Sequence, residues 1–296
     1  MIHGLIGWPS NHAFEAAREK KILDLWEEKY RPCSLNFTHF TEKLNEVENI
    51  SVSREKVCLL LREKGVADIK PKRGRKHRKE RERRTQFGEL LQQDTSPHDW
   101  LGTGKIYHAV NVVDDATSKI LFLKLFEYDG TLPNMEAMRD VIFKFGLPMS
   151  YYVDKAAWFN VTRHWDGTIS KQSSTDYETQ IERALEELAV ELIYANSAPA
   201  KGRVERSNGT LQDRLIAELK LHGCKTLKAA NRFIATYFIN DYERRFGIEP
   251  VDPSSAFISF VGRAQLDRIL CLRFTSTVQN YNTISKSQYY KLQFLP

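Results

Sequence analysis

The 296-residue sequence has no run of about 18 apolar residues, so nothing in it is expected to span a membrane. Its first residues also lack the charged start and the long apolar stretch of a secretory signal. The four cysteines are scattered without a Cys-x-x-Cys pair, which argues against zinc-ligand spacing and against a small disulfide framework. We therefore expect an intracellular protein with reduced thiols and no membrane partner.

Positive charge is concentrated in one segment. The formal net charge is +6, yet residues 70–84 contain ten Lys and Arg against two Glu, so the rest of the chain carries −2. Such concentration indicates an interaction with nucleic-acid phosphates, and a solvated linker is the alternative. The candidate contacts in this segment are Lys70, Lys72, Arg73, Arg75, Lys76, Arg78 and Lys79.

The region before the basic segment has a helical pattern. Apolar spacing predicts helices over residues 10–31, 37–47 and 54–64, the last capped by Ser53 and ended by Gly65. Two short helices around a turn, braced by a third, are typical of a helix-turn-helix unit, although any small three-helix bundle gives this pattern. In such a unit Arg54 and Lys56 would lie where recognition helices meet base edges.

The pattern after residue 87 alternates strands and helices. We predict strands at 88–94, 107–114, 119–127, 149–154 and 191–195, and helices at 132–145, 175–189, 204–221 and 227–245. Two further strands are expected at 272–278 and 289–294. The predicted domains are a helix-turn-helix domain (1–69), a basic linker (70–86), an α/β catalytic core (87–249), and a C-terminal linker with a partial β module (250–296).

Three acidic residues have the setting that a two-metal site requires. Asp94 and Asp154 end strand-like runs, and Glu205 opens a helix after a glycine turn. Two metal ions need carboxylates from different rigid elements that converge on one point. Oxygen ligands without Cys or His favour Mg²⁺ or Mn²⁺ over zinc. Asp114 and Asp115 are also carboxylates, but their sequence context indicates a hairpin turn.

Several polar residues flank the three carboxylates. Asn208 and Gln212 follow Glu205 on the same helix face and are candidate DNA contacts. Positive side chains suited to phosphate are Lys155, Lys201, Arg203 and Arg206, and for each of them simple solvation is the alternative.

The same segments resemble the DDE transposases of bacterial insertion sequences, in the retroviral-integrase superfamily, and the group called ISNCY in particular. The resemblance is carried by the residues around Asp94, by Asp114-Asp115-Ala-Thr, by Val153-Asp154-Lys155, and above all by Ala200-Lys-Gly-Arg-Val-Glu205-Arg. It implies an RNase H-like core with a mixed five-stranded sheet and flanking helices. It also implies two Mg²⁺ or Mn²⁺ ions held by Asp94, Asp154 and Glu205.

The resemblance further implies the cutting and joining of DNA ends. The partners would be double-stranded DNA of the transposon ends and the target, and further copies of the chain on that DNA. The expected location is the bacterial cytoplasm, with the nucleoid.

Some features depart from that family. There is no His/Cys zinc module, and fifty residues separate Asp154 from Glu205, more than is common in integrases. We also expect a chain truncated at both ends relative to the family. The alternatives are therefore a catalytically inactive remnant or DNA-binding regulator, and an RNase H-type nuclease.

Overall fold

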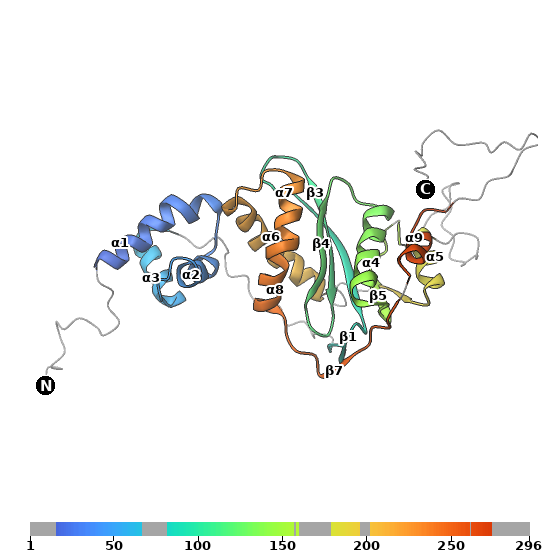
Figure 1. Cartoon of the computed structure of the whole chain (residues 1–296). Coiled ribbons are helices and arrows are strands. Elements are labelled where there is room, and N and C mark those ends of the chain that lie inside the picture. The colour runs from blue at the N-terminus through green and yellow to red at the C-terminus, as the bar shows by residue number, and fades with distance from the viewer. Residues whose placement is uncertain are drawn as a thin grey trace, which may run out of the picture.

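The computed structural model describes residues 16–66, 82–156, 158–159, 179–195, 202–260 and 262–273. Residues 16–66 form a helical unit, and a mixed α/β core begins near residue 86 (Figure 1). Within the described stretches, no helix combines the length and the apolar character needed to cross a membrane. The basic segment from Lys70 to Lys79 lies outside the described residues.

Three helices make up the helical unit. α1 (Ala16–Leu25) continues through a π-helical turn (Trp26–Tyr30) and a 3₁₀ turn (Arg31–Cys33). α2 (Phe37–Glu46) and α3 (Arg54–Glu63) each end one residue before the predicted position. The sequence pattern therefore located all three helices, although the residues before 16 lie outside the described part.

Side-chain caps set where α2 and α3 begin. Asn36 Oδ1 accepts a hydrogen bond from the backbone N–H of His39 at 2.8 Å, and Ser53 Oγ accepts one from the N–H of Lys56 at 3.3 Å. Such bonds satisfy first-turn N–H groups that have no partner within the helix. The apolar faces of the three helices meet in a cluster that includes fully buried rings around Trp26.

Five strands form one mixed sheet in the order β4-β3-β2-β5-β6. β2 pairs antiparallel with β3, and β3 pairs antiparallel with β4. β5 runs parallel to β2, and β6 parallel to β5. The bounds are β2 Leu91–His98, β3 Tyr107–Asp114, β4 Ile120–Phe126, β5 Ser150–Val153 and β6 Glu191–Tyr194. This sheet with flanking helices and a helical N-terminal region confirms the predicted fold class.

The central strand differs from its prediction. β2 begins at Leu91 rather than 88 and continues to His98, so Asp94 lies within the strand and not at its end. β3 pairs with β2 along this whole length, whereas β5 pairs with β2 only at Leu91 and Gln92. Beyond that point no strand in the described part of the chain pairs with this edge of β2, and a strand edge is where a proline such as Pro97 is tolerated.

One face of the sheet is covered by α4 (Thr131–Phe145), α5 (Gln180–Glu187) and α9 (Arg263–Ile269). Their apolar side chains form one buried cluster with inward residues of the strands. α5 opens with a reciprocal capping box between Thr179 and Glu182. The prediction began this helix at 175, but residues 160–178 lie outside the described part.

The opposite face is covered by α6 (Gly202–Leu221) and by a second run made of α7 (Leu227–Phe233), a π-helical turn (Ile234–Phe238) and α8 (Ile239–Phe246). These helices share a second apolar cluster with the sheet. Figure 1 shows α6 and α8 between the sheet and the helical unit. α6 therefore faces two hydrophobic cores.

The core continues past residue 249, where the sequence analysis ended it. The short strand β7 (Asp252–Ser255) pairs with β1 (Gln86–Phe87), and α9 is part of the first apolar cluster. Neither β7 nor α9 was predicted. The strands expected at 272–278 and 289–294 fall almost wholly outside the described residues.

Candidate active site

Alternate residues of β2 bond to successive turns of α6. Side chains two apart on a strand share a face, and residues four apart on a helix share a face. The bonds join the N–H of Val204 to Gln92 Oε1 at 3.1 Å, Asn208 Nδ2 to Asp94 Oδ2 at 2.8 Å, and Gln212 Nε2 to Ser96 Oγ at 3.1 Å. α6 is therefore aligned along β2, with Asn208 against the Asp94 carboxylate.

Asp154 is aligned with Asp94 across neighbouring parallel strands. Gln92 pairs with Tyr152, so Asp94 and Asp154 each lie two residues beyond a paired position. Parallel strands lie about 4.8 Å apart, and residues in register point to the same face. Asp154 follows the last residue of β5 and is exposed, and its Oδ1 accepts a hydrogen bond from the N–H of Ala156 at 3.1 Å. The register therefore predicts that both carboxylates lie on the sheet face that α6 covers.

Glu205 is in the first turn of α6 and is exposed. It precedes Asn208 by three residues, and residues at this helical spacing have Cβ atoms about 5–6 Å apart. Since Asn208 bonds to Asp94, Glu205 lies one turn from the residue that contacts the central carboxylate.

The donor chemistry of these residues fits a hard divalent ion. All three are carboxylates, Asp94 is partly exposed, and the other two are exposed. Among the described residues, no three His, Cys, Asp or Glu side chains already form a group that could hold a metal ion. The assignment of Asp94, Asp154 and Glu205 as ligands therefore stays a prediction.

Asp114 is fully buried in the turn between β3 and β4. Its Oδ2 accepts hydrogen bonds from the N–H and the hydroxyl of Thr117 at 2.8 and 2.7 Å, and its Oδ1 accepts one from the N–H of Gly88 at 2.9 Å. Burial raises the pKa of Asp114, and these bonds only partly oppose the rise. The hairpin interpretation holds, and this carboxylate ties the turn to the start of β2.

Asp115 is also fully buried, and it fixes the start of α6. Its Oδ1 accepts hydrogen bonds from Arg203 Nη1 at 2.8 Å and from Gln92 Nε2 at 2.6 Å. Gln92 in turn bonds to the N–H of Val204. The sequence analysis assigned no role to Gln92 and interpreted Asp115 only as a turn residue. The spacing of Gln92, two residues before Asp94 on the same strand, could have indicated that both face α6.

Arg203 was predicted to contact DNA, but the structure places its side chain in this buried ion pair, with 8% of its surface exposed. A guanidinium in that position anchors the first turn of α6 two residues before Glu205. The geometry therefore favours a positioning role over a phosphate contact.

The other face of β2 is held by α4. Gln93 is fully buried, and its Nε2 donates to Asn134 Oδ1 at 2.7 Å. Asn134 donates to Asp129 Oδ1 at 3.0 Å, and Thr95 donates to the same oxygen at 3.2 Å. The strand that carries Asp94 is therefore fixed from both sides, a feature that sequence reasoning missed.

The remaining predicted contacts are scattered around the site or away from it. Lys155 and Arg206 are exposed beside Asp154 and Glu205, whereas Lys201 lies outside the described residues. Arg54 and Lys56 are in the first turn of α3, at the far side of α2 from α6. No described contact tests whether any of these side chains binds DNA.

Comparisons with known proteins give relatives and distant structural neighbours. No family model matches the chain. A protein of Sinorhizobium fredii whose name describes it as a transposase (y4bF) is 34% identical over 249 residues, which is 84% of this chain and 52% of that relative. The transposase for insertion sequence IS1202 of Streptococcus pneumoniae is 29% identical over 283 residues, which is 83% of this chain and 58% of that relative.

Among solved structures, the catalytic core domain of the HTLV-2 integrase, in complex with magnesium and in a dimeric form, matches with a TM-score of 0.38 and 14% identity. That match covers 51% of this chain and 88% of the other. A simian T-cell lymphotropic virus intasome in complex with the PP2A regulatory subunit B56 gamma has a TM-score of 0.40 and 12% identity, over 74% of this chain and 68% of the other.

The chain spans little more than half the length of the curated relatives it matches. Both of those relatives are bacterial, and both matches extend over more than four fifths of the present sequence. Over most of its own length, the chain is therefore a homologue of bacterial proteins named transposases.

Proposed function

We propose that the chain is the catalytic part of a transposase that cuts DNA at the ends of an insertion sequence and joins those ends to target DNA. The observation that carries this proposal is the placement of Asp94. It lies on the central strand, two residues beyond the Gln92–Tyr152 pair from which Asp154 is equally far, and is bonded to Asn208 one turn beyond Glu205. This placement supports the proposal that Asp94, Asp154 and Glu205 act at one region of the sheet.

In this proposal two divalent ions would be held by Asp94, Asp154 and Glu205. When bound, Mg²⁺ or Mn²⁺ would activate the attacking oxygen and stabilise the leaving oxygen of the phosphodiester. Asn208 orients the Asp94 carboxylate through the bond to its Oδ2. The attacking group is water in end cleavage and the freed 3′-hydroxyl in strand transfer, so no covalent enzyme intermediate is required.

Double-stranded DNA is the proposed partner, bound by several copies of the chain together. Exposed Lys155 and Arg206 are suited to hold phosphate beside the carboxylates. On α3, Arg54 Nε donates to Thr38 Oγ1 at 2.7 Å, and half-buried Lys56 pairs with half-buried Glu19 at 3.1 Å. These weak surface contacts can be exchanged for DNA, so α3 remains the candidate for base recognition.

Substitution of one carboxylate tests the proposal. Asp94→Asn should abolish Mg²⁺-dependent cleavage of a duplex taken from the DNA that flanks the coding sequence, including its terminal inverted repeat. Binding of that duplex should change little, because affinity comes mainly from basic groups. Asp24→Asn removes the same charge from the exposed face of α1 and serves as the matched control.

Three outcomes would contradict the proposal. Retained nicking by a clean preparation of Asp94→Asn would place the active site elsewhere. Absence of cleavage by the wild type with either ion would indicate an inactive remnant or a DNA-binding regulator. Preferential cleavage of an RNA–DNA hybrid would indicate an RNase H-type nuclease.

A further inference from the structure

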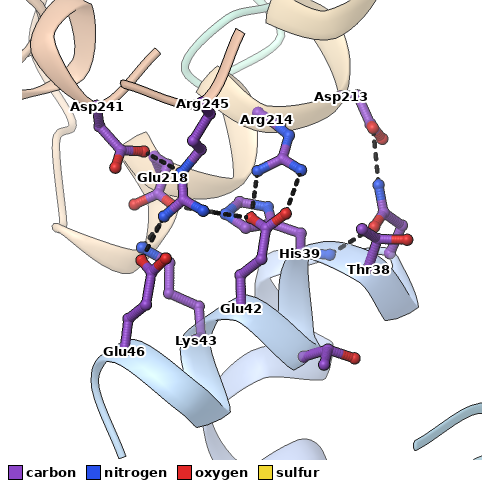
Figure 2. A network of polar contacts seen from close by, with 12 residues as sticks. Thr38, His39, Glu42, Lys43, Glu46, Asp213, Arg214, Glu218, Asp241 and Arg245 are labelled. Carbon is purple, nitrogen blue, oxygen red and sulfur yellow. Dashed lines mark hydrogen bonds and ion pairs between the residues drawn. The ribbon is translucent and has the colours of Figure 1, made fainter. Parts of the chain in front are cut away.

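The helical unit is joined to the core by a buried polar interface that the proposed chemistry does not use (Figure 2). At its centre is Glu218 of α6, which is 2% exposed. Glu218 Oε1 lies 2.5 Å from His39 Nε2 and 2.7 Å from Lys43 Nζ, and both donors come from α2. Burial alone would raise the pKa of Glu218, but the bonds from His39 and Lys43 lower it below its usual range.

Beside Glu218, two core arginines bind carboxylates of the helical unit. Arg214 of α6 binds Glu42 in a bidentate manner, at 2.5 and 2.8 Å. Arg245 of α8 binds Glu42 at 3.0 Å, also contacts Glu46, and is held by Asp241 of its own helix at 2.8 Å. Figure 2 shows these side chains converging between α2 and the two core helices.

Apolar packing adds to the same interface. Ala217 of α6 is buried in the hydrophobic cluster of the helical unit, whereas Leu211, Leu215 and Leu219 are buried in the cluster under the sheet. α6 is therefore a single helix with one part in each core. From Glu205 to Glu218 it advances thirteen residues, or about 20 Å at 1.5 Å per residue.

Separation of the two parts would be costly. It would leave Glu218 and Lys43 without the charged partners that offset their burial, and a buried charge that loses its partner is strongly destabilising. α3 packs on α2 through Val57 and Leu61 within the same cluster, so it is held to α6 as well. The described contacts therefore favour one body over two modules joined only by the connecting chain.

We propose that this interface sets the distance between the bases that α3 reads and the phosphate that the carboxylates cut. The proposal deepens the proposed function and rests on it. A unit attached only by a linker would sample many separations and would tolerate variable spacing in the DNA. A docked unit presents the duplex at one separation, so Glu42, Arg214 and Glu218 act as positioning residues that determine where the cut falls.

The first arm of the test measures the docking without DNA. Hydrogen exchange of α2 is compared in the full-length wild type, in Glu42→Ala/Glu46→Ala, and in Arg214→Ala, which breaks the interface from the core side. We expect both variants to raise exchange in α2 at least tenfold, and Arg214→Lys to recover part of the protection. Arg232→Ala, at an exposed position on α7, is the control and should match the wild type. Unchanged exchange in both interface variants would overturn the docking.

The second arm measures cleavage with Mg²⁺. The probes are the duplex from the flanking DNA and derivatives with one to four base pairs inserted between the inverted repeat and the cut. Two inserted base pairs move the phosphate by about 7 Å along the axis. We expect the wild type to lose at least tenfold in rate or to cut at the original distance from the repeat, whereas the two interface variants should accept every spacing at similar rates.

The two arms separate the possible failures. In one outcome, the wild type cuts the duplexes with insertions at the shifted phosphate as fast as it cuts the original duplex. That result would overturn the spacing role although α2 is docked. If the wild type cuts none of the duplexes, the proposed function fails and the spacing role fails with it. In that case the exchange arm still decides whether the helical unit is held to the core.

Discussion

Removal of Arg203 should both destabilise the protein and weaken the proposed metal site. The Arg203 and Asp115 side chains are 8% and 0% exposed, with their charged atoms 2.8 Å apart. In Arg203→Ala the buried Asp115 carboxylate loses this charged partner, while the Gln92 amide and the backbone N–H of Arg84 still donate to it. Loss of one partner from a buried ion pair costs about 3–5 kcal/mol.

That cost translates into a measurable change in melting temperature. For a domain of 150–250 residues, 1 kcal/mol corresponds to roughly 2–4 °C, so we expect a decrease of about 6–20 °C. Lys105→Ala is the control, because Lys105 pairs with Glu127 at an exposed site where salt bridges contribute little. Its melting temperature should equal that of the wild type.

A paired substitution distinguishes an unpaired charge from lost packing. Combining Arg203→Met with Asp115→Asn removes both charges, and the new amide can still accept a hydrogen bond from Gln92. Most of the lost stability should return, because no buried charge is left without a partner. If Arg203→Ala changes the unfolding free energy by less than about 1 kcal/mol, the pair behaves like a surface salt bridge and the reasoning fails.

The same substitution tests how the start of α6 is positioned. Arg203 and Gln92 hold the turn that carries Glu205, so Mn²⁺ affinity, measured by electron paramagnetic resonance, should fall by about 10–100-fold in Arg203→Ala. Arg206→Ala, on the exposed side of the same turn, should leave Mn²⁺ affinity unchanged. Equal affinity in the Arg203 variant would show that Glu205 does not depend on this anchor.

Three further predictions concern pH, backbone strain and salt. The pKa values of Glu42, Glu218 and Asp241 are each lowered in the folded protein, because burial, which raises them, is outweighed by hydrogen bonds and nearby positive charges. These carboxylates therefore stabilise the fold above the ordinary carboxyl pKa, and this stabilisation is lost as pH falls through the lowered values. Between about pH 5 and pH 3 the wild-type melting temperature should fall more steeply than that of Glu42→Gln, and parallel curves would contradict this. Gly88→Ala should lower the free energy of unfolding by roughly 2–4 kcal/mol in denaturant titrations, because φ of Gly88 is +88° and the added Cβ would lie 2.3 Å from the Phe257 ring. A variant as stable as the wild type would refute this prediction. Neutralising four basic residues should flatten the salt dependence of duplex binding by up to about 0.9 per lost phosphate contact, and an unchanged slope would identify the segment as a linker. Those four residues are Arg73, Arg75, Arg78 and Lys79.

Elements with local signals were predictable from the sequence. Ser53 marks the start of α3, and the turn at Asp114 and Asp115 sets the β3–β4 hairpin, because caps and turns depend on neighbours within a few residues. The placement of Glu205 in the first turn of α6 was also predicted, although the described helix begins two residues earlier.

Features that depend on distant contacts were not predictable. β2 was ended at Asp94 because polar residues follow, yet the strand continues since Ser96 bonds to Gln212 and its backbone pairs with β3. The pairing of Asp115 with Arg203 joins residues 88 apart in sequence, and no local pattern reveals such a contact. α9 was missed for a different reason, because seven residues carry too short a period to distinguish helix from loop.

The matched bonding between β2 and α6 explains why the long interval between Asp154 and Glu205 is compatible with the proposed site. Two strand residues advance about 6.6 Å and four helical residues about 6.0 Å, so three successive bonds can form in only one alignment. One residue inserted in α6 between Glu205 and Asn208 would turn Glu205 about 100° away from Asn208. An insertion before α6 would not, because the helix takes its position from the strand. Glu205 can therefore take the same position whether fifty residues or about thirty precede it after Asp154, since lengthening a loop adds little to the entropic cost of closing it.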